Sequence, residues 1–409
     1  MRDLSLTTLS PQNWPFSLEW LPKTAYMVGG AVRDALLGRQ SEYLDLDFVL
    51  PFKAVNIARQ IASHYQAGFV LLDAERQIAR VVFKQGTADF ANQEGETIER
   101  DLHRRDFTVN AIAYSPHTNE LIDPLEGCAD LQQRVMRMIS PTNLQSDPLR
   151  LLRAYRQAAQ LGFAISPETQ LAIRQLAPLL GEIAAERVRV EFGYLLATSQ
   201  GSIWLKTAGE DGLLTTWFPH TTSDSLYLLI AVDRAGELLA ETWPELRQLL
   251  STWIEKTIKT SWLAIAKLAT LLDPATAEAE LLHLKYSRVE IKAAIVILKY
   301  LPKLSSPMAV REQYFLFREL GSVFPSLAVV AVAKGIELAA IAPLIDRYLN
   351  PEDRVAHPIQ LVSGKDLMSA LNLPAGRQIG ELISEIQVAQ AEGKISTYEE
   401  ALELAAKLL

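Results

Sequence analysis

Two aspartates separated by one residue give the first indication of chemistry. Asp45 and Asp47 belong to a segment of alternating polar and apolar residues, 45–50, which predicts a β-strand. Side chains two positions apart on a strand share a face, so both carboxylates lie together while Leu46 faces the core. Their mutual repulsion favours a cation between them, and Mg²⁺ bound by carboxylates and substrate phosphates supplies that charge in nucleotidyl transfer. A neighbouring strand normally adds a third carboxylate, for which Asp89 is the candidate.

A glycine pair upstream of these aspartates predicts a phosphate-binding turn. The apolar segment 26–28 ends in Gly29 and Gly30 and leads into a helix, for which Gly38 suits the C-terminal cap. Backbone N–H groups at a helix start bind phosphate, and Arg33, one turn further on, adds a charged donor. A lone glycine pair is usually only a turn, and a lone Asp-x-Asp is usually a solvated edge. The two features together, in this order, favour a triphosphate site.

A second polar motif follows at residues 104–111. This segment contains Arg104, Arg105, Asp106 and Asn110. Considered alone, the two arginines would be surface charges and the other two residues would be helix caps or turn formers.

The segment from Asp147 to Arg156 predicts a helix that could recognise a nucleobase. Asp147 and Arg150 are one turn apart, and an aspartate accepts where an arginine donates. Cytosine and adenine both present an amino donor beside a ring-nitrogen acceptor, whereas guanine and uracil reverse this pattern. Arg153 can approach a triphosphate, and Arg156 lies about 180° around the helix from Asp147. The alternative is that Ser146 or Asp147 caps the helix and the arginines are solvated.

The elements that position these residues change character along the chain. The first 140 residues predict a mixed α/β region with strands at 26–28, 45–50, 69–72 and 79–83. Helical periodicity dominates from about residue 147 onward. Predicted helices lie near residues 168–181, 186–198, 224–240, 261–272, 287–300, 376–391 and 397–408.

Composition is ordinary for a globular protein, with 49% hydrophobic and 22% charged residues in a chain of 409. The net charge of −8 disfavours a uniformly basic nucleic-acid binder but allows a local basic groove. The single cysteine, Cys128, is typical of a reducing compartment. The apolar stretch 326–345 contains Lys334 and Glu337 and predicts a buried helix rather than a membrane span. No signal peptide is evident, so we expect a cytoplasmic protein without membrane association.

The motifs resemble those of a known family. Residues 29–34, 37–39 and 45–47 are similar to the signature of the tRNA nucleotidyltransferase and bacterial poly(A) polymerase family, the class II branch of polymerase-β-like nucleotidyltransferases. Residues 104–111 resemble the second motif of this family almost letter for letter. Weaker likeness lies at 186–191, where an intrahelical ion-pair face is the simplest interpretation, and at 363–368, 373–380 and 393–395.

The resemblance implies an α+β protein with a polymerase-β-like head followed by all-helical domains. We expect a head at 1–140, a neck that recognises the base at 141–200, and an RNA-binding body and tail at 201–350 and 351–409. It implies transfer of CMP or AMP from CTP or ATP to the 3′ end of tRNA without a template. Asp147 and Arg150 would read the base, and the motif at 104–111 would contact sugar and triphosphate. The family usually has Glu before this aspartate, where this chain has Ser146.

The spacing between two motifs bears on which nucleotides are added. Members that add the complete CCA sequence contain a flexible loop between the third-carboxylate strand and the second motif. Here only residues 90–103 separate Asp89 from Arg104, without the Glu-x-Tyr and Pro-Gly residues of that loop. The resemblance then predicts an enzyme that adds the two cytidines and works with a separate A-adding enzyme, and addition of the complete CCA sequence is the alternative within this family.

Two other functions stay open at this point. A poly(A) polymerase of the same family is the nearest alternative, although many of those carry a long basic C-terminal extension that this sequence lacks. A non-catalytic RNA-binding scaffold is the alternative of a different class. The presence of Asp45, Asp47, Arg105, Asp147 and Arg150 argues against a scaffold.

Overall fold

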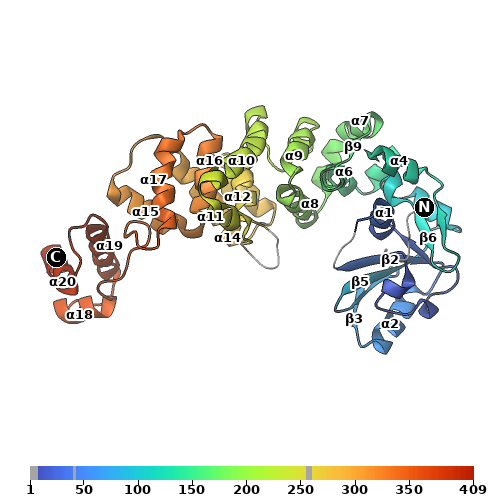
Figure 1. Ribbon diagram of the computed structural model, residues 1–409, viewed down its shortest axis with the longest axis horizontal. Helices are drawn as coiled ribbons and strands as arrows, with labels where there is room; N and C mark the ends of the chain where they lie inside the picture. The colour runs from blue at the N-terminus through green and yellow to red at the C-terminus, as the bar shows by residue number, and fades with distance from the viewer. Residues whose placement is uncertain (1–7, 40–42, 255–259) are drawn as a thin grey trace. The chain divides into compact units, whose positions relative to one another are not determined.

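The computed structural model describes residues 8–39, 43–254 and 260–409. The chain forms two compact units (Figure 1). The first comprises Met1–Ile183 and Asp211–Leu213, and the second comprises Ala184–Glu210 and Leu214–Leu409. The expected α+β class is confirmed, because the first unit is mixed and the second is helical. The finer division into head, neck, body and tail stays a prediction.

The first unit is built on a seven-stranded sheet with the order β3-β4-β5-β2-β1-β6-β7. Strands β2 and β5 run parallel, and all other neighbouring pairs are antiparallel. A separate short pair joins β8 to β9. The strands are β1 (Tyr26–Val28), β2 (Leu44–Leu50), β3 (Gly68–Asp73), β4 (Ile78–Val82), β5 (Gly86–Asn92), β6 (Ala113–Ser115), β7 (Glu120–Ile122), β8 (Val135–Met136) and β9 (Ala164–Ile165).

The two faces of β2 have opposite chemistry, as its alternation predicts. Leu46 and Phe48 are buried, and the Phe48 ring stacks on Phe90 of β5 with centroids 5.4 Å apart. Asp45 and Asp47 point to the other face. The aromatic core therefore fixes the register that brings the two carboxylates together.

The helices of the first unit lie on both sides of this sheet. Helix α2 packs against β4 and β5, whereas α1 contacts β1, β2 and the short 3₁₀ helix Thr108–Asn110 (Figure 1). Gly38 ends α1 in the left-handed conformation with φ 71°, as expected for a C-terminal cap. The helices are α1 (Gly30–Leu37), α2 (Ala54–His64), α3 (Ile98–His103), α4 (Gly127–Gln133), α5 (Pro141–Ser146), α6 (Leu149–Leu161) and α7 (Pro167–Leu176).

The second unit consists of helices within the described residues, and all of the predicted helices from 186 onward are confirmed. The helices of this unit are α8 (Ala185–Ala197), α9 (Gly201–Glu210), α10 (Ser223–Thr242), α11 (Pro244–Ser251), α12 (Trp262–Thr270), α13 (Ala277–His283), α14 (Arg288–Tyr300), α15 (Val310–Leu320), α16 (Phe324–Ala333), α17 (Leu338–Leu349), α18 (Gly364–Leu371), α19 (Arg377–Ala391) and α20 (Tyr398–Lys407). The last three helices share a small apolar core of their own around Leu367, Ile386 and Ala401.

The most apolar part of the second unit is a core element. The helical run Val310–Ala333 is long and apolar enough to cross a membrane by length and composition, but 67% of its most apolar window is buried inside the protein. Helix α16 within it packs against α10 and α12. A turn at Gly335, with φ 83°, separates α16 from α17. The expectation of a buried helix in 326–345 is confirmed for α16, and the remainder of the stretch forms this turn and most of α17.

The motif at 186–191 has a different role from the one expected. Arg189 on α8 forms an ion pair with Glu290 of α14 at 2.7 Å, and its guanidinium lies 4.7 Å from the Tyr286 ring centroid. Glu290 also accepts from Thr260 at 2.8 Å. The intrahelical interpretation is wrong for Arg189, because a nearby helix supplies a buried carboxylate that a helical pattern alone does not reveal.

Candidate active site

The predicted phosphate-binding and metal-binding residues meet in one cavity of about 390 Å³ in the first unit. Three segments form it: the glycine turn with β2, the motif at 104–110, and α6. Six arginines but only three aspartates line the cavity, so a local positive charge exists in a chain of net charge −8. Of the predicted site residues, the lining includes Gly29, Gly30, Arg33, Asp45, Asp47, Arg104, Arg105, Asp106, Asn110, Arg150, Arg153 and Arg156.

The sheet register places the aspartates at the floor of the cavity. Val28, beside the glycine turn, pairs with Asp47. Asp45 accepts a hydrogen bond from the Thr87 hydroxyl on β5 at 2.7 Å, which fixes its carboxylate. A Cβ atom on Gly29, where φ is 74°, would lie only 3.1 Å from Oδ2 of Asp47. Glycine is therefore required at this turn both by its backbone conformation and by the carboxylate behind it.

The third carboxylate is engaged by an arginine. Asp89 lies opposite Asp47 in the parallel β2–β5 pair. Arg80 on β4 donates two hydrogen bonds to Asp89, from Nε at 2.7 Å and from Nη2 at 2.8 Å. Among the described residues, no three side chains of the metal-binding types gather closely enough to hold an ion. The catalytic role of Asp89 stays a prediction, and no sequence pattern indicated its pairing with Arg80.

The remaining pair of carboxylates fits a divalent cation. Removal from water raises the pKa of Asp47 to about 7, and the charges of Asp45 and Asp89 add to this effect against the opposing Arg105 and Arg80. The raised pKa means that the ionised form of Asp47 is unfavourable unless a positive charge lies close to it. One or two carboxylates together with substrate phosphates are a common ligand set for Mg²⁺. Asp45 and Asp47 are of the residue type that this ligand set requires, and their role as metal ligands stays a prediction.

The raised pKa predicts a pH dependence of cation binding. A bound cation displaces the proton from Asp47, so affinity for Mn²⁺ should fall about tenfold per pH unit below about 7 and level off above it. Mn²⁺ binding measured by electron paramagnetic resonance at pH 6 and pH 8 checks this. The Asp47→Asn variant cannot ionise at this position, so we expect it to bind Mn²⁺ weakly at both pH 6 and pH 8. Equal affinity of the natural protein at both pH values would contradict the assignment.

The helix that follows the glycine turn is tied to the second motif. Arg33 donates from Nη1 to Oδ1 of Asn110 at 2.8 Å and is held from the other side by Asp34 at 3.0 Å. Asn110 in turn donates to Asp106 and to Gln157, both at 2.9 Å. Gln157 on α6 was not predicted. Gln157 lies four residues after Arg153 and therefore on the same helix face, which is the sequence pattern that could have indicated its place in the site.

Asp106 is the buried acceptor of this motif. Burial opposes its charge, but the pKa stays below its ordinary value because Arg153 lies 3.4 Å away and Asn110 donates to it. The Nε atoms of Arg105 and Arg153 are buried and have no hydrogen-bond partner within the described residues. Two unsatisfied cationic donors beside a cavity indicate an anionic ligand with several oxygens, such as a triphosphate.

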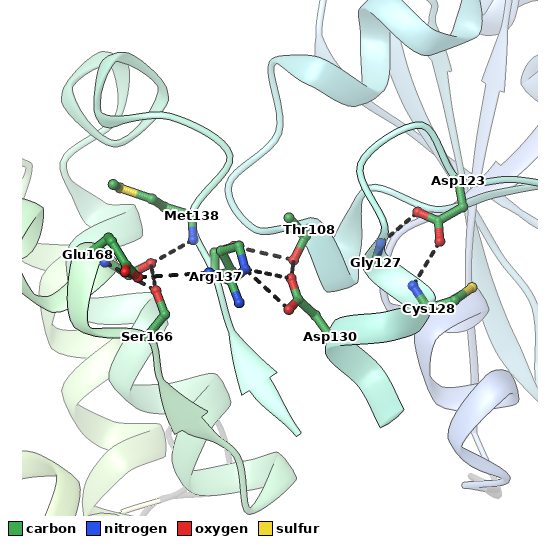
Figure 2. A network of polar contacts seen from close by, with 10 residues as sticks. Thr108, Asp123, Gly127, Cys128, Asp130, Arg137, Met138, Ser166 and Glu168 are labelled. Carbon is green, nitrogen blue, oxygen red and sulfur yellow. Dashed lines mark hydrogen bonds and ion pairs between the residues drawn. The ribbon is translucent and has the colours of Figure 1, made fainter. Parts of the chain in front are cut away.

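A network of polar contacts that is not part of the cavity lining links Thr108 of the second motif to α4 and to Arg137 (Figure 2). Thr108 donates its hydroxyl hydrogen to Asp130 of α4 at 2.6 Å, and Arg137 donates to the same carboxylate at 3.2 Å. The Thr108 backbone N–H also bonds the Arg137 carbonyl at 3.0 Å. Asp123 accepts from the first N–H groups of α4, and its charge, after burial, helps to raise the pKa of the Cys128 thiol to about 12. Burial and Asp123 therefore disfavour the thiolate form of Cys128, which is the reactive form.

Gly127, the first residue of α4, packs closely against the backbone of Thr108. A Cβ atom there would lie 2.3 Å from the Thr108 carbonyl oxygen and 2.9 Å from Ile112. We expect Gly127→Ala to lower the free energy of unfolding by about 1–3 kcal/mol. Gly193→Ala is the control, because apart from its chain neighbours and the nearby backbone of its own helix no atom lies within 4 Å of the added methyl group. Urea denaturation of both variants checks the prediction, and an unchanged midpoint for Gly127→Ala would contradict it.

Asp147 is not at the N-cap position of helix α6, which is occupied by Pro148. The helix starts at Leu149 after Pro148, with no side-chain cap, and Ser146 donates instead to the Asn143 carbonyl at 2.8 Å. The interpretation of Ser146 or Asp147 as its N-terminal cap is therefore wrong. The turn is closed by the backbone, since the Asp147 carbonyl accepts from the Arg150 N–H at 2.9 Å.

Three arginines of α6, Arg150, Arg153 and Arg156, line the cavity, although ideal helix geometry placed Arg156 on the side opposite Asp147. Nη1 of Arg150 donates to the backbone carbonyls of Arg104 and Asn143, both at 2.9 Å. Arg156 donates to Gln160 at 2.9 Å and also lines the cavity. Asp147 is half-buried next to Arg150, and its charge acts on that guanidinium. Its base-reading role stays a prediction.

A mixed sheet that presents two carboxylates beside a glycine turn and an arginine-rich helix defines the nucleotidyltransferase class. Residues 25–137 match the "Poly A polymerase head domain" family. Residues 162–225 match the "Probable RNA and SrmB- binding site of polymerase A", and residues 256–406 match a "tRNA nucleotidyltransferase domain 2" model.

Two relatives match nearly the whole chain. It is 49% identical over 407 residues to the CC-adding tRNA nucleotidyltransferase of Synechocystis, covering 97% of this chain and 96% of the relative. It is 35% identical to the CC-adding tRNA nucleotidyltransferase of Geobacter sulfurreducens, covering 94% and 91%. The chain therefore belongs to the tRNA nucleotidyltransferase family and is a nucleotidyltransferase, a class that works with a divalent metal cation.

Solved structures share the fold. A complex of a CCA-adding enzyme with CTP aligns with a TM-score of 0.73 at 23% identity, covering 94% of this chain and 91% of the other. The Thermotoga maritima CCA-adding enzyme in complex with tRNA aligns with a TM-score of 0.70 at 23% identity, covering 94% and 91%.

Proposed function

We propose that this enzyme transfers two CMP residues from CTP to the 3′ end of tRNA and then stops, so that a separate A-adding enzyme completes the CCA sequence. The names of the two relatives described above support this. We further propose Mg²⁺ as the cation, the helical unit as the RNA-binding part, and the cytoplasm as the location.

The observation that carries the proposal is the short connection between β5 and α3. Strand β5 ends at Asn92 and α3 begins at Ile98, so only residues 93–97 lie where complete CCA-adding relatives have a flexible loop. Thr97 caps α3, and Gly95 turns the chain with φ 95°. A connection this short leaves no segment that could move over the nucleotide and change the specificity from CTP to ATP.

The residues of the cavity account for nucleotide binding and transfer. Asp45 and Asp47 would hold the cation, which when bound offsets the triphosphate charge and lowers the pKa of the attacking hydroxyl. The 3′-hydroxyl of tRNA attacks the α-phosphate in line, and pyrophosphate leaves. Arg105 and Arg153 have free Nε–H donors for phosphate oxygens. Asn110, held by Arg33 and Gln157, is placed for the sugar.

Base selection would come from Asp147 and Arg150 rather than from a nucleic-acid template. The carboxylate accepts from the amino group of cytosine, and the guanidinium donates to its N3 atom. Uracil presents an acceptor and an N–H donor in the same places, so both contacts fail. Each failed buried contact costs about 1–3 kcal/mol. Arg150 is fixed for this task by its two bonds to backbone carbonyls.

Nucleotide incorporation into defined tRNAs tests the proposal. CTP and ATP are supplied separately with Mg²⁺ to tRNAs that lack CCA, end in C or end in CC. We expect CMP on the first two and no incorporation on the third. AMP added to the third would show a complete CCA-adding or an A-adding enzyme. Repeated AMP addition to any RNA would show a poly(A) polymerase, and no incorporation would favour a scaffold.

A further inference from the structure

A buried carboxylate outside the cavity lining contacts both arginines of the second motif. Asp101 on α3 has 0% exposure. Its Oδ1 atom accepts from Nη2 of Arg104 at 2.8 Å, and its Oδ2 atom accepts from Nη2 of Arg105 at 3.0 Å. Oδ1 also accepts from the backbone N–H of Glu94 at 3.1 Å. A fully buried aspartate is costly unless every oxygen is paired, as it is here.

We infer that Asp101 is a positioning residue for the nucleoside triphosphate: it aims Arg105 into the cavity and fixes residues 93–97 to Arg104. Neither the predicted site nor the family resemblance included Asp101. Its spacing of three and four residues before the two arginines, on one helical turn, was the signal in the sequence.

The geometry at Arg105 leaves donors available to a ligand. Asp101 engages only Nη2 of this guanidinium. Nε is buried without a partner among the described residues, and Nη1 lies 3.7 Å from the position that a Gly29 Cβ would occupy, beside Asp47. One end of the planar guanidinium is thus anchored while the rest faces the floor of the cavity. Without the anchor, the long side chain would lose its single orientation.

The geometry at Arg104 connects the short segment to the base-reading helix. Arg104 lies between two carboxylates, Asp101 at 2.8 Å and Glu94 at 3.2 Å. Its backbone carbonyl accepts from Nη1 of Arg150 at 2.9 Å. A continuous series of polar contacts therefore joins residues 93–97 to Arg150.

The charge balance agrees with this role. Burial alone would raise the pKa of Asp101, but Arg105, then Arg104, and the donated hydrogen bonds keep it below the ordinary value. Asp101 is therefore ionised whenever the enzyme works, and it makes charge-assisted bonds to both guanidinium groups. The fixed segment 93–97 also explains how the preference for CTP is maintained. This point rests on the proposed function.

Nucleotide binding to Asp101→Asn tests the inference. The substitution keeps the shape and removes the charge, so CTP affinity should fall about 10- to 100-fold. CMP, which lacks the β- and γ-phosphates, should bind within about threefold of its affinity for the natural protein. In steady-state incorporation, the loss should appear in KM for CTP more than in kcat. Both affinities are measured by isothermal titration calorimetry with the full chain.

A matched pair of variants covers the case in which Asp101→Asn fails to fold. Glu94→Gln weakens the second contact to Arg104 and should reduce CTP affinity about threefold. Glu96→Gln makes the same charge change in the same exposed segment, where its side chain has no partner among the described residues, and should have no effect.

Three results would overturn the inference: unchanged CTP affinity in Asp101→Asn, an equal loss for CTP and CMP, or equal effects of Glu94→Gln and Glu96→Gln. The proposed function fails separately, if the natural enzyme adds no CMP to tRNA. CTP binding still decides the role of Asp101 in that case.

Discussion

Asp47→Asn is expected to reduce the rate of CMP incorporation by at least about 10³-fold. The amide keeps the shape behind Gly29 but removes one of the two charges that would hold the cation. A catalytic metal contributes several kcal/mol of transition-state stabilisation, and each 1.36 kcal/mol is a factor of ten in rate. Single-turnover incorporation with a tRNA lacking CCA measures the effect.

Two controls define what this result means. Binding of tRNA to Asp47→Asn should stay within about twofold of the natural protein, since the change adds no bulk and lies on the cavity floor. Asp89→Asn examines the third carboxylate, which Arg80 engages. A loss as large as that of Asp47→Asn would make Asp89 catalytic. A loss of tenfold or less would make it a partner of Arg80. Normal incorporation by Asp47→Asn would refute the proposed site.

Arg150→Ala is expected to reduce the preference for CTP over UTP about 10- to 100-fold. The guanidinium is the donor proposed for N3 of cytosine, and one failed buried contact costs about 1–3 kcal/mol. Its loss also leaves the carbonyls of Arg104 and Asn143 without this donor, so Arg150→Lys, which keeps the charge but not the planar fork, should give an intermediate preference. The ratio of kcat/KM values for CTP and UTP measures the effect.

Arg156→Ala serves as the matched control for this prediction. Arg156 lies on the same helix, lines the same cavity and bonds Gln160 at 2.9 Å. Its removal should lower kcat/KM for both nucleotides by the same factor and leave their ratio unchanged. If Arg150→Ala also left the ratio unchanged, base selection would lie elsewhere.

The local elements of the site followed from the sequence, because their signals are short-range. Alternation over residues 45–50 predicted strand β2 and the shared face of Asp45 and Asp47, and both are observed. Gly38 was expected to end α1 and does so. These features depend on backbone conformation and on a period of two or 3.6 residues, which neighbouring positions fully define.

The contacts that orient the site came only from the tertiary structure. Arg80 engages Asp89 across two antiparallel strands, and Thr87 holds Asp45 across a parallel pair. Asn110 reaches Gln157, 47 positions away. No periodicity records such pairs, because strand order and register are decided by the packing of the whole sheet.

The sequence by itself determined the class of protein, the carboxylate pair, the glycine turn and the helical remainder. It did not determine how the arginines are held. Asp101 and Arg105, for example, could each have faced solvent, and burial in the folded unit makes their pairing obligatory, since an unpaired charge there is too costly. Local patterns thus specified which groups are present, and long-range packing decided which of them line the cavity.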